Sequence, residues 1–314
     1  MPVSYASHIK KELVRISSRL CCQRAELSAL IKINGTISLS NSGIGLDFST
    51  ENAAIARRTL ELIKNIFPDT PTSLMSQKKS NLKKNNSYIV KLTESAQAIA
   101  ANLGIMNDDG FVDGIAPNII DTECCRRAYL RGAFLAGGSI NNPGTSTYHF
   151  EILTKQAGHA KDLKRLLNSF DLNARILERK KGYITYIKES EKISDFLRVV
   201  GANNAVLTFE DIRIIRDIRN SDNRLNNCEI ANETKTLNAA DRQLADIELI
   251  ESVYGASYLD ERLSYVAELR REFPEENLMY LSEIATGRGY KLSKSGINHR
   301  MRKITSLAAQ IRGQ

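Results

Sequence analysis

Hydrophobic and polar residues follow the same order of patterns twice over the first two hundred positions. Residues 21–33 carry apolar positions at helical spacing and end at Asn34-Gly35, a helix-stop signal. A strand-like run at 46–50 follows, and then another at 87–95 that leads into a helix-like run. The same order returns at 124–136, 150–154 and 182–190. The pattern predicts one unit of helix, strands and helix, present twice.

The residue identities repeat as well as the pattern. CCQRAELSALIKINGTI at 21–37 aligns with CCRRAYLRGAFLAGGSI at 124–140 without a gap, and seven of the seventeen positions are identical. We therefore predict two repeats, about 21–104 and 124–201, in one domain of residues 1–200. Glycine inside a helix costs about 0.5 to 1 kcal/mol relative to alanine. Gly132, beside small Ala133 and Ala136, therefore indicates that the two repeated helices pack closely.

The pattern beyond residue 258 is helical. An amphipathic run at 259–272 is followed by a shorter one at 278–285 with Asn277 as its candidate N-cap, and Ser293 is the candidate cap of the last helix. That helix places four apolar residues inward: Ile297, Met301, Ile304 and Ala308. Its start and outer side carry the predicted DNA contacts: Ser293, Lys294, Ser295, Asn298, His299, Arg302 and Lys303. Residues 238–314 are thus predicted to form an all-α helix-turn-helix domain. The alternative is a small helical bundle with an ordinary basic surface.

A linker helix is predicted between the two domains, at 201–237. Several of its residues suit phosphates and base edges and recur every three to four positions on one face. The residues on this face are Arg213, Arg216, Asn220, Asn223 and Asn227. Arg224, next to Asn223, is also a predicted DNA contact. A solvated linker helix without DNA contacts remains the alternative.

Charge favours a polyanionic partner. The 314-residue chain has a net charge of +8, and its last acidic residue is Glu283. Seven basic residues follow that position: Arg288, Lys291, Lys294, Arg300, Arg302, Lys303 and Arg312. A solvated helix face normally interleaves charges of both signs. The first domain also carries basic residues, from which we expect part of the salt dependence of DNA binding: Arg57, Arg58, Lys78, Lys79, Lys83 and Lys84.

The remaining features predict a cytoplasmic protein. No uninterrupted apolar run is long enough to span a membrane, and the N-terminal residues form a charged helix rather than a signal peptide. The cysteines form two adjacent pairs, 21–22 and 124–125, with Cys228 alone. Adjacent cysteines lack zinc-finger spacing, and the odd total argues against a disulfide framework. They are predicted to be small apolar core residues, and neither a metal ion nor a cofactor is expected.

The repeated motif carries a family resemblance. LRGAFLAGGSI at 130–140, with Leu27 to Gly35 as its partner, resembles the LAGLIDADG motif of homing endonucleases. The resemblance implies an α+β, pseudo-twofold domain of the αββαββα type, whose saddle-shaped sheets sit on DNA. In active members an acidic residue before the last glycine of the motif holds magnesium. Asn34 and Gly137 stand there, and Lys32 and Leu135 occupy the motif's other acidic position. Carboxylates are the ligands that magnesium requires, so we predict no catalytic residues and no nuclease activity.

The chain as a whole resembles the WhiA family. SYASHIKKELVRI opens it, NRLNNCEIAN and KTLNAADRQ join the two domains, and LSKSGINHRMRKI at 292–304 marks the last. This resemblance implies sequence-specific binding of double-stranded DNA, links to cell division, chromosome segregation or sporulation, and a nucleoid location. It also implies that the nuclease-like domain modulates binding or meets a protein partner. The DNA site, the regulated genes and the oligomeric state do not follow from the sequence.

Two other functions remain open at this point. A scaffold at the nucleoid would use the saddle-shaped sheets of the nuclease-like domain to bind another protein. A metal-dependent endonuclease would need relocated carboxylates, for which Asp108, Asp109 and Asp113 are the candidates, although they lie in a predicted loop outside the motif.

Overall fold

The computed structural model describes residues 4–40, 43–78, 86–92, 94–145 and 147–313. The chain divides into two compact units, Met1–Arg216 and Asp217–Gln314. The division falls inside helix α8 (Asn203–Tyr254), in the segment predicted as a linker.

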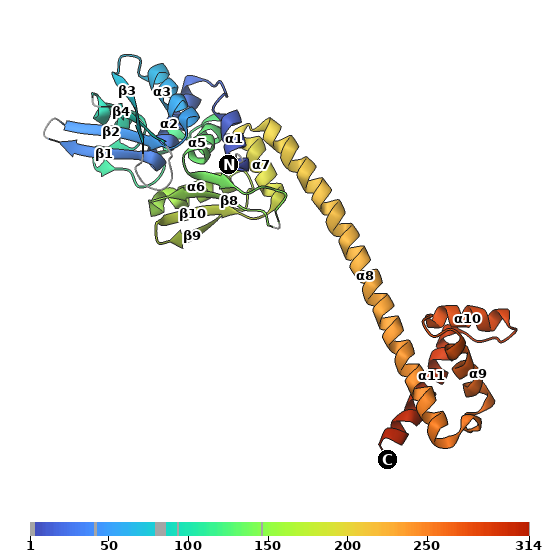
Figure 1. The fold of residues 1–314 in the computed structure, drawn as a ribbon. Coiled ribbons are helices and arrows are strands. Elements are labelled where there is room, and N and C mark those ends of the chain that lie inside the picture. Colours follow the sequence, from blue (N-terminus) through green and yellow to red (C-terminus); the bar gives the residue numbers. More distant parts are fainter. Residues whose placement is uncertain (1–3, 41–42, 79–85, 93, 146, 314) are drawn as a thin grey trace. The chain divides into compact units, whose positions relative to one another are not determined.

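Two long helices form the centre of the first unit (Figure 1). They are α2 (Leu20–Asn34) and α5 (Glu123–Gly137), the two helices of the repeated motif. At Gly132 of α5, a Cβ atom would lie 2.3 Å from the carbonyl oxygen of Glu26 on α2. Only glycine permits this approach, so the predicted close packing of the two helices is confirmed.

Each motif helix leads into a four-stranded antiparallel sheet. The strands of the first sheet pair in the order β1-β2-β4-β3 and those of the second in the order β7-β8-β10-β9, so the repeats share one topology. The first sheet contains β1 (Gly35–Ser40), β2 (Gly43–Thr50), β3 (Thr72–Lys78) and β4 (Asn86–Leu92). The second contains β7 (Gly138–Ile140), β8 (Phe150–Thr154), β9 (Arg175–Arg179) and β10 (Gly182–Ile187). The α+β, pseudo-twofold fold is confirmed.

Shorter elements complete this unit around one hydrophobic core. They are α1 (Tyr5–Leu13), α3 (Ala53–Ile66), α4 (Ala96–Asn102), β5 (Met106–Asn107), β6 (Gly110–Phe111), a 3₁₀ turn (Pro117–Ile119), α6 (Ala157–Asn168) and α7 (Ser190–Val200). In each repeat one amphipathic helix, α3 or α6, packs its apolar side against its own sheet. Asn52 caps α3 by accepting hydrogen bonds from two of its backbone amides, which fixes where that helix begins.

A buried polar contact ties each central helix to its neighbour. Glu26 of α2 is fully buried, and its carboxylate accepts hydrogen bonds from Arg58 of α3 and from Arg131 of α5, each at 2.9 Å. In the second repeat the hydroxyl of Tyr129 lies 2.8 Å from His159 Nε2 of α6. Burial lowers the pKa of His159 to about 3, so this histidine is neutral at physiological pH.

The second unit is entirely helical. Beyond the end of α8, it contains a 3₁₀ turn (Ala256–Tyr258), α9 (Glu261–Glu272), α10 (Leu278–Gly287) and α11 (Lys294–Arg312). A second hydrophobic core joins these helices to the end of α8. Within the described residues, no helix of either unit combines the length and hydropathy that crossing a bilayer demands.

Candidate nucleic-acid interface

Helix α11 is set by its cap and by its inward face. Ser293 Oγ accepts a hydrogen bond from the backbone amide of Gly296 at 3.2 Å, as expected of an N-cap. The four predicted inward residues, Ile297, Met301, Ile304 and Ala308, are 0 to 2% exposed. Because the start and the buried face of α11 are both fixed, the residues that form its outer face are fixed as well.

The outer face of α11 is polar and basic. Lys294 and Ser295 are exposed in the first turn, Asn298 is half-buried, and His299, Arg302 and Lys303 are exposed further along. Asn298 and Arg302 are four residues apart and therefore neighbours on one side of the helix. The side chains predicted to read DNA thus lie together at the amino-terminal part of one helix. Their role in binding DNA stays a prediction.

The turn between α10 and α11 is longer than in a minimal helix-turn-helix, but it is well packed. Gly289 takes a φ of +88°, a conformation that favours glycine. Ser282 Oγ donates a hydrogen bond to the carbonyl oxygen of Leu292 at 2.7 Å, and the rings of Tyr265 and Tyr290 stack with centroids 4.0 Å apart. These contacts hold the start of α11 against the rest of its unit.

Two arginines of the basic tail are used within the unit. Arg288 donates two hydrogen bonds to the Glu272 carboxylate, at 2.7 and 2.5 Å, and Arg312 pairs with Asp246 at 2.7 Å. The sequence prediction had counted both with the basic surface. The cationic face of α11 is therefore concentrated at Lys294, Arg302 and Lys303.

The predicted contacts on α8 fall into two groups. Arg213 pairs with Glu210 at 2.8 Å and with Glu191, and Arg216 lies over the ring of Tyr148 at 4.4 Å. Both arginines therefore fasten the first turns of α8 to the first unit. The remaining predicted residues are exposed: Asn220, Asn223, Arg224 and Asn227. For these four, DNA contact stays a prediction.

The basic residues expected on the first unit are not one surface. Arg58 is 5% exposed and bonded to Glu26, so its assignment as a DNA-facing cation was wrong. Arg57 is exposed on helix α3 and Lys78 is exposed at the end of strand β3. Lys79, Lys83 and Lys84 lie outside the described residues.

The outward faces of the two sheets carry acidic residues at matching places. Asp47 of β2 pairs in register with Thr36 and Lys91, and Glu151 of β8 pairs with Ser139 and Tyr186. Their neighbours along each strand, such as Leu46 and Ile152, are buried against the helices. Because side chains alternate along a strand, both carboxylates project from the face opposite the helices. The two carboxylates lower the positive potential of these faces, although Lys91 lies beside Asp47 and His149 bonds Glu151.

The positions that hold metal in active nucleases have other contacts here. Asn34 Nδ2 donates to the carbonyl oxygen of Ala136 at 3.1 Å, which joins the ends of α2 and α5. At Gly137, a Cβ atom would lie 2.6 Å from the carbonyl oxygen of Leu153. Neither Gly137 nor Gly138 has a positive φ. Lack of space, and not backbone conformation, requires glycine at 137.

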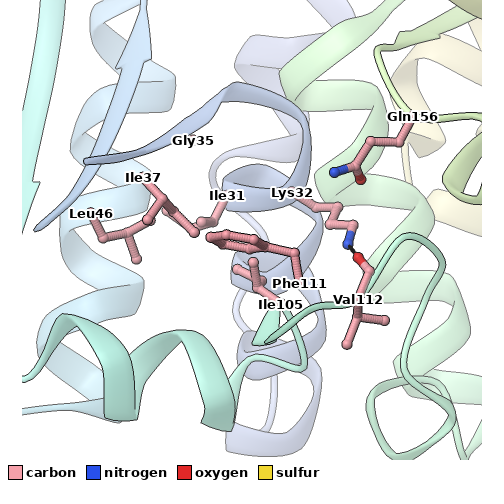
Figure 2. A pocket seen from close by; sticks show the side chains of 9 residues that line it. All are labelled: Ile31, Lys32, Gly35, Ile37, Leu46, Ile105, Phe111, Val112 and Gln156. Carbon is pink, nitrogen blue, oxygen red and sulfur yellow. Dashed lines mark hydrogen bonds between the residues drawn. The ribbon is translucent and has the colours of Figure 1, made fainter. Parts of the chain in front are cut away.

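A cavity of about 200 Å³ lies beside the end of α2 (Figure 2). Phe111, Ile105 and Ile37 form its apolar side, and Lys32 reaches across it to donate a hydrogen bond to the carbonyl oxygen of Val112. Lys32 stands at one of the motif's two acidic positions. Its ammonium group is held at Val112 and not at Asn34, because side chains two positions apart in a helix face different sides.

Of the relocated carboxylates, only Asp113 lies near enough to Lys32 to oppose the fall that burial causes in the pKa of Lys32. Asp108 and Asp109 lie in the exposed turn between β5 and β6, and Asp113 accepts a hydrogen bond from the backbone amide of Gly158 at 3.0 Å. Asp113 thus serves the start of α6 as a structural acceptor.

Replacing Lys32 with leucine, the residue at the matching position 135, should alter the pH dependence of stability. Burial lowers the pKa of Lys32 from 10.5 to about 8, although Asp113 and Asp162 oppose the shift. Between these pH values the unfolded chain holds a proton that the folded protein has lost, so stability rises with pH across this window. In Lys32→Leu we expect a smaller rise and the largest gain in unfolding free energy below pH 8.

Urea unfolding at pH 7 and pH 9.5 measures the effect. Burial also lowers the pKa of Lys10 to about 8. Lys10 is present in the variant, so part of the rise in stability with pH remains. Lys78→Leu is the control, because Lys78 is exposed. Equal pH profiles for wild type and Lys32→Leu would contradict the prediction.

Comparison with known proteins agrees with this architecture. Three family models match the chain: the WhiA N-terminal LAGLIDADG-like domain at 20–106, the WhiA LAGLIDADG-like domain at 126–219 and the WhiA C-terminal HTH domain at 223–308. A protein named "Probable cell division protein WhiA" from Bacillus thuringiensis (strain Al Hakam) is 51% identical, over 99% of this chain and 97% of its own length. The protein of the same name from Bacillus cereus (strain B4264) is also 51% identical, over 99% and 98%.

Two solved structures are similar over long segments. Full-length DUF199/WhiA from Thermatoga maritima is 27% identical with a TM-score of 0.57, and the match covers 98% of both chains. The N-terminal LAGLIDADG domain of DUF199/WhiA is 25% identical with a TM-score of 0.50, covering 64% of this chain and 92% of that one. With a duplicated LAGLIDADG-like fold, a C-terminal helix-turn-helix domain and this identity along nearly its whole length, the chain belongs to the WhiA family.

Proposed function

We propose that this protein is a sequence-specific regulator that binds double-stranded DNA through α11 and does not cleave it. The observation that carries the proposal is the division of α11 into two faces. Its inner side is sealed in the core by Ile297, Met301 and Ile304, and its outer side presents Asn298, Arg302 and Lys303. A helix that exposes its amino-terminal part in this way suits insertion into the major groove.

Three contacts in the first unit support the absence of nuclease chemistry. The amide of Asn34 is engaged with Ala136, Gly137 has no room for a side chain, and the motif's other acidic position on α2 holds Lys32, which is bonded to Val112. A carboxylate pair that binds magnesium is the element that such nucleases need. The unit therefore keeps the nuclease fold for another use, and we propose that the protein needs no cofactor.

The biological setting follows from relatives. Those described above are named cell division proteins, and we propose that this chain acts in cell division, chromosome segregation or sporulation. A regulator of this kind would be cytoplasmic and associated with the nucleoid.

Selection from fragmented genomic DNA, followed by titration of the recovered site against its scrambled version, tests the proposal with the full chain. Specific DNA binding commonly exceeds non-specific binding by about 10³-fold or more. Equal affinity for both duplexes would refute sequence-specific regulation. A plasmid assay with magnesium or manganese belongs beside it, because metal-dependent cleavage would refute the non-enzymatic assignment.

Restoring the acids should not restore cleavage. We expect Asn34→Asp combined with Gly137→Asp to be destabilised without magnesium, since the new carboxylates face the carbonyl oxygens of Ala136 and Leu153. Magnesium between the carboxylates would partly restore stability, with cleavage absent or barely detectable. Thermal melts with and without magnesium, beside plasmid nicking, measure both effects. Asn34→Ala is the control that removes the amide without adding charge, and strong nicking by the double variant would contradict the prediction.

A protein-binding role for the first unit is the second candidate. Asp47 and Glu151 on the outward sheet faces favour it, because each carboxylate lowers the positive potential of its face. The salt dependence of DNA affinity separates the two uses of the sheets. If the triple variant Lys294→Ala, Lys303→Ala, Arg302→Ala, combined with Arg224→Ala on α8, keeps most of the salt dependence, the first unit contacts DNA after all. If the salt dependence is nearly lost, the sheet faces are free for a protein partner.

A further inference from the structure

Four cysteine thiols meet where the two central helices begin, and the proposed function does not use them. Cys21 and Cys22 lie in the first turn of α2, and Cys124 and Cys125 in the first turn of α5. Their four Sγ atoms all lie within 4.8 Å of one another. The duplication thus brings two adjacent pairs, one from each repeat, to one place in the fold.

Burial in the core accounts for only half of this cluster. Cys22 and Cys125 are each 6% exposed, as the sequence prediction of small apolar core residues requires. Cys124 is half-buried against the core, but Cys21 is exposed, as is Cys228 outside the cluster, so the prediction was wrong for Cys21 and Cys228. The exposed Cys21 gives an ion in solution a route to the cluster.

The spacing of the sulfur atoms suits a single tetrahedral ion. Zinc binds thiolates at about 2.3 Å, which places the sulfurs of a regular tetrahedron about 3.8 Å apart. The Sγ atoms of Cys21 and Cys22 are 3.9 Å apart, and the 4.8 Å limit on the other pairs requires movement of about 1 Å at most. An iron–sulfur cluster would insert several irons between its ligands, and sulfurs this close leave room for one ion.

The surroundings of Cys124 favour the negative charge of a thiolate. Arg19 Nη2 donates a hydrogen bond to Cys124 Sγ at 3.3 Å, and Thr122 Oγ1 lies 3.3 Å from the same sulfur. Both cysteine pairs also sit at helix amino termini, where unpaired backbone amides and the helix dipole stabilise anions. The cluster therefore combines the donor type, the spacing and the charge compensation of a thiolate metal site.

We propose that Cys21, Cys22, Cys124 and Cys125 bind one Zn²⁺ ion that joins the starts of α2 and α5. Four protein ligands leave no open coordination position, so the ion is structural and not catalytic. It would lie at the opposite ends of the helices from Asn34 and Gly137. The ion would thereby stabilise the packing of the two repeats, and it would share no ligand with the former nuclease site.

Cobalt titration of the reduced, chelator-treated full-length protein tests the site. Co²⁺ bound to four thiolates gives strong visible absorption typical of tetrahedral sulfur coordination. We expect saturation at one Co²⁺ per chain, loss of the absorption when Zn²⁺ is added, and a higher melting temperature with Zn²⁺. The single variants Cys21→Ser and Cys124→Ser should weaken cobalt binding at least about tenfold. Cys228→Ser is the matched control, because this exposed cysteine lies on α8 outside the cluster.

Each alternative has its own result. Absence of the tetrahedral absorption would overturn the proposal, as would equal weakening in Cys228→Ser, which would mark adventitious binding to any accessible thiol. Metal-free protein isolated from cells with a disulfide among the four cysteines, detected by non-reducing mass spectrometry, would overturn it too. Cys21 is exposed, so Cys21→Ser should fold without zinc. If it does not fold, melting temperatures decide the question. A similar Zn²⁺-dependent rise in wild type and in Cys228→Ser supports the proposal, and no rise in either protein overturns it.

Discussion

Replacing Asn298 or Arg302 with alanine is expected to weaken binding to the cognate DNA site by about 5- to 150-fold and to leave non-specific binding nearly unchanged. The two side chains lie four residues apart on the exposed face of α11, and amide and guanidinium groups suit bidentate readout of adenine and guanine. A lost bidentate contact costs about 1 to 3 kcal/mol, which corresponds to that loss of affinity. Titrations with cognate and scrambled duplexes measure it.

Two control variants on the same helix sharpen the result. Lys303→Ala removes an exposed cation suited to a phosphate, so it should weaken both duplexes alike and reduce the salt dependence by about one unit. Gln310→Ala, in the last turn of α11, should change neither. Equal losses on both duplexes for Asn298→Ala and Arg302→Ala would show that this face touches only the phosphate backbone.

The Glu26→Gln variant is expected to lose about 3 to 5 kcal/mol of unfolding free energy in the first unit. Glu26 is fully buried and receives hydrogen bonds from Arg58 and Arg131, which are 5% and 6% exposed. A neutral amide in its place removes the charge partner of Arg131 and leaves Arg58 paired only with the exposed Glu61. Glutamine has nearly the same volume as glutamate, so the loss reflects the missing charge and not a cavity.

Urea denaturation followed by a signal from the first unit measures this change. Glu61→Gln is the matched control, since Glu61 also pairs with Arg58 but is 56% exposed. An exposed ion pair contributes about 0 to 1 kcal/mol, so this control should stay near wild type. Similar losses for both variants would show that burial of Glu26 is not what makes its charge matter.

The amino-acid sequence determined the features that depend on near neighbours and on the duplication. The repeat at an offset of 103 predicted the paired central helices, and Gly132 predicted their close approach. Asn277 and Ser293 cap α10 and α11 as expected, and the apolar spacing in α11 identified its buried face. Capping and periodicity act within one or two helical turns, which is why a single sequence reveals them.

Tertiary structure decided which charged and reactive groups are available. Arg58 has the same charge as Arg57, yet it turns inward to Glu26, which lies 32 positions away in the chain. Arg213 and Arg216 share a helix face with exposed asparagines, yet Arg213 pairs with Glu191 of α7 and Arg216 lies over the ring of Tyr148. Gly137 is required by a carbonyl oxygen on a strand that follows it, and the four cysteines meet only because α2 and α5 begin side by side. Such partners come together through packing between distant segments, a property that residue type and local spacing do not encode.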